Sequence, residues 1–209
     1  MHYIEVKNYT KKLKGKEVLK EINVRFEQGH VYGLKGKNGS GKTMLMRAIS
    51  GLIHSTEGTV EIDGKILGED MEYPDSMGLL LENPAFLSGE TGFQNLRILA
   101  RLRNKIGEQE IREIIVEVGL EPDDKRKYYK YSLGMKQKLG IAAAIMEKPD
   151  IIILDEPINA LDSETAEKIK NIIIREKERG AIIILACHNT EELEFLSDTI
   201  IEINDGKIL

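Results

Sequence analysis

The sequence has few of the features that mark secreted or membrane-spanning proteins. Its 209 residues include one cysteine, Cys187, which excludes an internal disulfide and a zinc site built from several cysteines. The longest apolar runs, such as residues 151–154 and 181–187, are far too short to span a bilayer. The first residues also lack the apolar stretch of a signal peptide. We therefore expect a cytoplasmic protein.

An excess of positive charge is also missing. The 30 Lys and Arg residues are outnumbered by 35 Asp and Glu residues, which gives a net charge of −5. Proteins that bind a polyanion usually carry an excess of positive charge, which this sequence lacks. We therefore expect no nucleic-acid partner. The lysine-rich stretches at residues 7–20 and 125–130 are typical of solvated faces or turns, with contacts to anionic lipid or to a nucleotide as the alternative.

Three glycines lie in a sequence that is typical of a phosphate-binding loop. Residues 36–43 read GKNGSGKT, between a strand-like segment at residues 30–34 and an apolar helical segment at residues 44–52. Glycines let the backbone N–H groups face the phosphates, at a helix start that favours an anion. Lys42 is expected to reach the terminal phosphates, and the Thr43 hydroxyl is expected to hold magnesium. The expected nucleotide contacts are Gly36, Lys37, Asn38, Gly39, Ser40, Gly41, Lys42 and Thr43.

The order of the predicted elements indicates an α/β fold. Strands are expected at residues 3–6, 18–26, 30–34, 59–62, 77–81, 151–154, 181–186 and 199–203. Helices are expected at residues 44–52, 93–103, 108–118, 133–146 and 164–178. We expect one domain over residues 1–209, with a nucleotide-binding core at residues 1–82 and 149–209 and a helical subdomain at residues 83–148. At this length the chain can bury one core of good size.

Two adjacent acids follow the apolar run at residues 151–154. Asp155 and Glu156 are expected at the carboxyl end of a parallel strand, where such sheets bind their ligands. Asp155 is placed to hold magnesium through water, and Glu156 to polarise the water that attacks the phosphate. The alternative is a solvated acidic turn, which the phosphate loop upstream makes less favourable.

The motifs together resemble those of a known family. A phosphate loop is followed by a helical insertion, a Ser-x-Gly-x-x-Gln element at residues 132–137, a strand that ends in Asp-Glu-Pro, the segment 159–162 and an isolated His188. In this order they resemble the nucleotide-binding subunit of an ATP-binding cassette (ABC) transporter. The resemblance implies a P-loop NTPase core with a mixed sheet, an antiparallel β subdomain and an inserted helical subdomain. It also implies ATP and Mg²⁺ as cofactors.

The same resemblance assigns roles to further residues. In the family two cassettes meet head to tail, so Ser132 and Gly134 of one chain would contact the γ-phosphate held by the other. Ser132 alone also fits a plain helix N-cap, and both roles can coexist. His188 would contact the γ-phosphate, although a lone histidine after a strand is more often structural. Asp162 would lie in the loop that links the two active sites, with a helix N-cap as the alternative.

The sequence departs from the family pattern at three places. Glu82 stands where the family usually has a glutamine that touches magnesium, so Glu82 is an expected metal contact. The element after Ser132 has lost one glycine, and both departures are similar to a bacterial branch that exports bacitracin, lantibiotics and related peptides. The aromatic residue that often stacks on adenine has no clear counterpart. The candidates are Leu13, Tyr9 and Tyr3, of which the tyrosines also fit ordinary strand packing.

The expected function is an ATPase subunit that closes a dimer on ATP and drives a separate polytopic membrane subunit. The protein would then lie at the inner face of the membrane, paired with a second ABC subunit of the same or a related sequence. Residues 83–92 and 93–102 are the candidates for a groove that receives a short helix of the membrane partner. The alternative is a soluble ABC-type ATPase with protein partners, such as in iron-sulfur cluster assembly.

Overall fold

The computed structural model describes residues 2–82 and 84–209, and its larger sheet has six strands in the order β10-β9-β3-β8-β7-β6. In that order the strands are Lys207–Ile208, Thr199–Asn204, Val31–Lys35, Ile182–Ala186, Ile151–Asp155 and Met77–Leu80. The strands from β9 to β6 run parallel, and β10 is antiparallel to β9. Every residue of β7 and β8 is buried, which explains the apolar runs at residues 151–154 and 182–186.

The smaller sheet is antiparallel, in the order β2-β1-β4-β5. Its strands are β2 Lys16–Glu27, β1 Tyr3–Leu13, β4 Glu57–Ile62 and β5 Lys65–Ile66. Both β1 and β2 are longer than the alternation of their residues predicts. Asn8 and Glu21 have positive φ angles of 46° and 50°, and the register of the β1–β2 pair shifts after Val6. The bulge at Asn8 interrupts the two-residue period of β1, so its predicted strand ends at Val6 while the observed strand continues.

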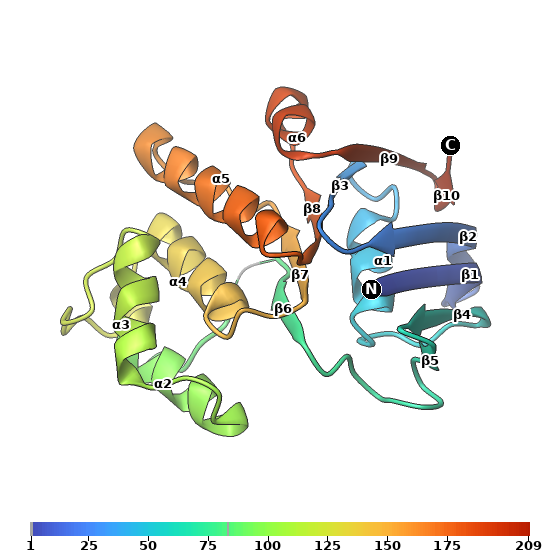
Figure 1. Cartoon of the computed structure of the whole chain (residues 1–209). Coiled ribbons are helices and arrows are strands. Elements are labelled where there is room, and N and C mark those ends of the chain that lie inside the picture. The colour runs from blue at the N-terminus through green and yellow to red at the C-terminus, as the bar shows by residue number, and fades with distance from the viewer. Residues whose placement is uncertain (1, 83) are drawn as a thin grey trace.

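Helices cover both faces of the larger sheet. They are α1 Lys42–Ile49, α2 Gly92–Arg103, α3 Glu108–Glu117, α4 Leu133–Ile145, α5 Ser163–Glu178 and α6 Thr190–Leu196, with a short 3₁₀ turn at Tyr128–Lys130. Ile152 and Leu154 of β7 pack with α2 to α5, whereas Ile151 and Ile153 pack with α1 and the smaller sheet. Figure 1 shows α4 and α5 on one side of the strands and α1 with the smaller sheet on the other. The mixed sheet, the antiparallel sheet and the helices confirm the predicted fold class.

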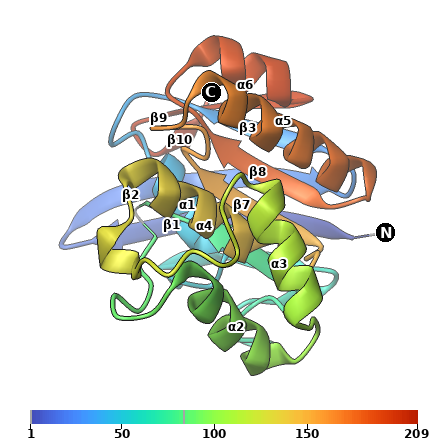
Figure 2. The ribbon, with the colours of Figure 1, turned by 90° about the vertical axis from the view of Figure 1, so that its left-hand side faces the viewer.

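Three helices, α2 to α4, lie between β6 and β7 in the chain, and they face the viewer in Figure 2. Close packing joins α4 to the sheet, because a Cβ atom added at Gly78 of β6 would lie 1.7 Å from the Ala144 carbonyl oxygen. The three helices fall within the predicted helical subdomain. Its first residue, Asn83, lies outside the described residues, and the division into subdomains stays a prediction.

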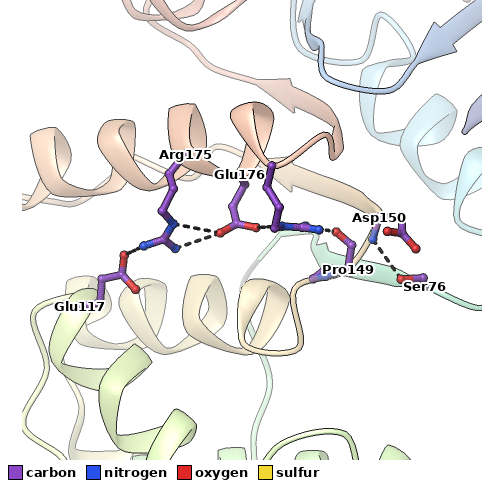
Figure 3. A network of polar contacts seen from close by, with 7 residues as sticks. Ser76, Glu117, Pro149, Asp150, Arg175 and Glu176 are labelled. Carbon is purple, nitrogen blue, oxygen red and sulfur yellow. Dashed lines mark hydrogen bonds and ion pairs between the residues drawn. The ribbon is translucent and has the colours of Figure 1, made fainter. Parts of the chain in front are cut away.

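A polar network ties α5 to the helical region (Figure 3). The Glu176 carboxylate is only 3% exposed and accepts hydrogen bonds from Arg175 at 2.9 Å and from Arg179 at 2.8 Å. Arg175 also pairs with Glu117 of α3, and Arg179 donates to the Pro149 carbonyl oxygen that precedes β7. The network therefore fixes α3 and the α4–β7 connection against α5.

Two short elements near the carboxyl end are absent from the sequence prediction. Helix α6 begins at the Asn189 cap, whose side chain accepts from the backbone N–H groups of Glu191 and Glu192. Strand β10 has only two residues, too few to show any period. Within residues 2–82 and 84–209, no helix combines the length and the apolar composition needed to cross a bilayer.

Candidate functional site

The phosphate-binding loop connects β3 to α1, as its sequence predicts. A Cβ atom at Gly36 would lie 2.3 Å from the Ile203 carbonyl oxygen, so no larger residue fits there. Gly41 has a φ of 119°, in a region that other residues rarely adopt, directly before the first residue of α1. Lys37, Asn38 and Gly39 are exposed, and the loop therefore presents its backbone at the end of a helix.

Lys42 and Thr43 lie at the start of α1 with their polar atoms inside the site. The Lys42 ammonium donates to the Gly36 and Lys37 carbonyl oxygens at 2.7 and 3.3 Å. The Thr43 hydroxyl donates to Asp155 Oδ2 at 2.7 Å, across 112 residues of sequence. Asp155 ends β7 and is 8% exposed. The fold thus brings the two sequence motifs into direct contact.

Glu156 lies beside His188. Glu156 Oε2 accepts the His188 backbone N–H at 3.0 Å, and Oε1 lies 3.6 Å from His188 Nε2. Burial raises the pKa of the Glu156 carboxyl above its ordinary value of 4.5, and the His188 backbone N–H opposes that shift. A carboxyl group in this environment is better suited to accept a proton than a fully solvated one.

These groups line one cleft of about 460 Å³, within the size range of small-molecule sites. Among the predicted residues, the cleft is lined by Asn38, Gly39, Gly41, Lys42, Thr43, Asp155, Glu156 and His188. Six further residues line the cleft and were not among the predicted site residues: Lys16, Glu17, Val18, Met44, Asp205 and Gly206. Lys16, Glu17 and Val18 fall within residues 7–20, for which contact with a nucleotide was an alternative. Asp205-Gly206 is a typical turn sequence, but no local pattern indicates that this turn reaches the phosphate loop.

Ser132, Gly134 and Asp162 do not line this cleft. The Ser132 hydroxyl caps α4 by accepting the Met135 N–H at 3.2 Å, and Asp162 caps α5 by accepting the Thr165 N–H at 2.9 Å. That Thr165 N–H holds the pKa of the Asp162 carboxyl below its usual value. The N-cap alternatives for both residues are therefore observed, and they leave contacts to a second chain open.

Glu82 is likewise absent from the lining of this cleft. Its carboxylate accepts a hydrogen bond from Arg47 of α1 at 2.7 Å. A guanidinium neutralises the carboxylate and occupies one of its oxygens. The contact engages Oε1 alone, and the role of Glu82 as a metal contact stays a prediction.

The Arg47–Glu82 pair is expected to stabilise the fold only slightly. Its side chains are 37% and 61% exposed, so water screens the attraction. We expect a double-mutant cycle with Arg47→Ala and Glu82→Ala to give a coupling of roughly 0.2–1 kcal/mol in urea unfolding. The similarly exposed pair Arg97–Glu108 serves as the matched control. A coupling above about 2 kcal/mol would contradict a surface pair.

None of the three candidates for the residue that stacks on adenine lines the cleft. Tyr9 is 2% exposed and donates to the Ile53 carbonyl oxygen at 3.1 Å. Tyr3 donates to Glu61, with Arg25 4.4 Å above its ring. Leu13 is 41% exposed at the end of β1. The residues of β2 that line the cleft are Lys16, Glu17 and Val18.

Comparison with known proteins gives three consistent similarities. Residues 19–159 match the family described as ABC transporter. The chain is 47% identical to an uncharacterized ABC transporter ATP-binding protein of Bacillus subtilis, over 98% of this chain and 94% of that protein. It is 38% identical to a bacitracin transport ATP-binding protein of Enterococcus faecalis, over 100% of this chain and 68% of that protein.

A solved structure supports the same relationship. The fold matches an ATP-binding cassette described as dimeric, in a post-hydrolysis state bound to ADP and Pi, with a TM-score of 0.89 and 26% identity. The match covers 98% of this chain and 96% of that one. Sequence motifs, cleft geometry and overall fold therefore agree.

Proposed function

This chain belongs to the ABC transporter family, and from that premise we propose that it is the ATP-binding and ATP-hydrolysing subunit of a membrane transporter. The observation that carries the proposal is the 2.7 Å contact between Thr43 and Asp155 in the cleft that also contains Glu156. It joins a phosphate-binding loop to a carboxylate pair, which is the arrangement that hydrolysis of a nucleoside triphosphate needs.

Each residue of the cleft has a role in this proposal. The backbone of the loop and the Lys42 ammonium bind the phosphates and neutralise charge. Glu156 orients the attacking water and accepts its proton, and His188 contacts the γ-phosphate. Ser132 and Gly134 contact the nucleotide of a second chain, as their position at the start of α4 allows.

Mg²⁺ fits the donors at the Thr43–Asp155 pair. Magnesium prefers oxygen ligands and usually takes one or two from the protein, with phosphates and waters completing its shell. Among the described residues there is no cluster of three or more carboxylate, imidazole or thiolate groups that could hold a metal alone. Thr43 and Asp155 would hold the ion, which would supply electrostatic stabilisation of the phosphate charge.

A groove of about 590 Å³ supports a membrane partner. It lies between the core and the helical region, and its lining is mostly apolar. Pro84, Ala85, Phe86 and Leu99 contribute to it, within the segments that we expected to receive a partner helix. An amphipathic helix buries its apolar face in such a groove. We propose a separate polytopic membrane subunit as the partner, with this chain at the inner face of the membrane.

The proposal extends to paired ABC subunits and to export of peptides or antimicrobial compounds. The dimeric cassette supports the pairing, and the bacitracin transport protein supports the kind of cargo. ATP held between two chains favours the closed pair, because a ligand shifts a conformation only through its differential affinity. Soluble partners, as in iron-sulfur cluster assembly, remain the alternative.

The groove provides the test. A photo-crosslinking residue at Leu52 or Phe86 is expected to crosslink to a polytopic membrane protein in cells, because both positions line the groove. The matched control is Phe195 of α6, which is 67% exposed but does not line the groove. Crosslinks from Leu52 and Phe86 to soluble proteins alone would favour the alternative.

A further inference from the structure

The backbone of Glu156 has an unusual conformation. Its φ is 53°, in the left-handed region that residues other than glycine seldom adopt. Such a conformation persists only where surrounding contacts fix it. Glu156 N–H donates to the Ala186 carbonyl oxygen at 2.9 Å, and the Glu156 carbonyl oxygen accepts the Asn159 N–H at 3.2 Å. Hydrogen bonds to β8 and to the following turn therefore fix the backbone N–H and carbonyl groups of Glu156.

A side chain from another helix completes the set. The amide nitrogen of Gln137, in α4, donates to the Glu156 carbonyl oxygen at 2.8 Å. Gln137 is 7% exposed, so its hydrogen bond is shielded from water. Within the described residues, Gln137 is the one side chain that hydrogen-bonds to the main chain of Glu156. It fixes the peptide from which the carboxylate projects.

The start of α4 also packs against the turn that follows Glu156. A Cβ atom added at Gly134 would lie 2.9 Å from the Ala160 carbonyl oxygen. Gln137 and Gly134 are three residues apart on one helix, and residues at that spacing lie on the same face. The helix and the turn are therefore in contact at two points, and a shift of α4 along its axis would pull on the Glu156 peptide.

We propose that Gln137 is a positioning residue that holds the Glu156 carboxylate in its reactive orientation. The inference rests on the proposed function, because it needs Glu156 to act on the attacking water. It adds that the helix whose first residues would contact the second chain's nucleotide also sets the catalytic carboxylate of its own chain. Gln137 does not line the cleft, and it acts through its hydrogen bond to Glu156.

The test replaces the donor without emptying the site. Gln137→Met in the full chain keeps the length of the side chain but cannot donate a hydrogen bond. We expect kcat for ATP hydrolysis to fall about 10- to 100-fold, the penalty of a small misplacement of a catalytic group. KM for ATP and the affinity for a fluorescent ATP analogue should change less than about twofold, since the phosphate loop is untouched.

A double-mutant cycle separates positioning from general structure. If Gln137 acts only through Glu156, then Gln137→Met should not lower the residual kcat of a Glu156→Gln chain any further. The matched control is Ser76→Ala, which removes a 3.0 Å hydrogen bond to the Asp150 N–H just before the other end of β7 (Figure 3). That variant should retain the parental kcat.

Two results would overturn the inference: an unchanged kcat in Gln137→Met, or an additive loss of kcat in the double variant. Should Gln137→Met fail to unfold cooperatively, Gln137→Glu has the same length with an acceptor in place of the donor, and it should show the same loss of kcat. The proposed function has a separate readout, because it fails only if the parent does not hydrolyse ATP or if Glu156→Gln hydrolyses it at the parental rate.

Discussion

Glu156→Gln is expected to lower kcat for ATP hydrolysis by a factor of about 10² to 10⁴, the usual contribution of a general base. Glutamine keeps the size of the side chain and can still accept the His188 N–H, which lies 3.0 Å from Glu156 Oε2. It cannot take a proton from water. ATP binding should persist, and a closed pair of chains should accumulate because the step that reopens it is blocked.

Phosphate release and size-exclusion chromatography with ATP measure the two effects. Glu167→Gln is the matched control, because Glu167 is 64% exposed on α5 and, among the residues that the structure describes, forms an ion pair only with Lys170. The parent should also lose activity as the pH falls through the pKa of Glu156, which burial raises above 4.5, since only the ionised carboxylate accepts a proton. Hydrolysis at the parental rate by Glu156→Gln would rule out this carboxylate as the base.

The second large effect is on stability. Glu176→Gln is expected to lower the free energy of unfolding by roughly 2–3 kcal/mol, below the full penalty for breaking a buried ion pair. The change leaves Arg175 and Arg179 facing a neutral amide at a site where Glu176 is 3% exposed. The loss is reduced because the two arginine side chains are 50% and 29% exposed and can reach water.

Urea unfolding measures the loss. Glu178→Gln is the control, since Glu178 is an exposed glutamate of the same helix. A decrease below about 0.5 kcal/mol in Glu176→Gln, as for an ordinary surface substitution, would show that the network in Figure 3 does not stabilise the joint between α5 and α3.

Local sequence was sufficient where the physical cause is local. The phosphate loop was predictable because its glycines and Lys42 have fixed spacings, and β7 and β8 were predictable because strands buried on both faces form nearly continuous apolar runs. Element ends were less certain. The bulge at Asn8 breaks the alternation inside β1, so the period disappears while the pairing continues.

Contacts across long stretches of sequence were not predictable. Nothing near Glu82 indicates that Arg47 pairs with its carboxylate, and nothing near Gln137 indicates that its amide holds Glu156. The lining of the cleft by Lys16 and Glu17 depends likewise on how the smaller sheet packs against α1. Each contact depends on where two separate elements meet.

The sequence by itself determined the chemistry of this protein: a loop that binds phosphates, a pair of acids after a buried strand, and the order of motifs that identifies the family. Only the tertiary structure decided the contacts that no motif implies, including the pairing of Glu82 with Arg47 and the hydrogen bond of Gln137 to the Glu156 carbonyl oxygen. The reason is physical. Residue type and spacing fix what a group can do and which element it belongs to, whereas packing of the sheets and helices fixes which groups lie within hydrogen-bond distance.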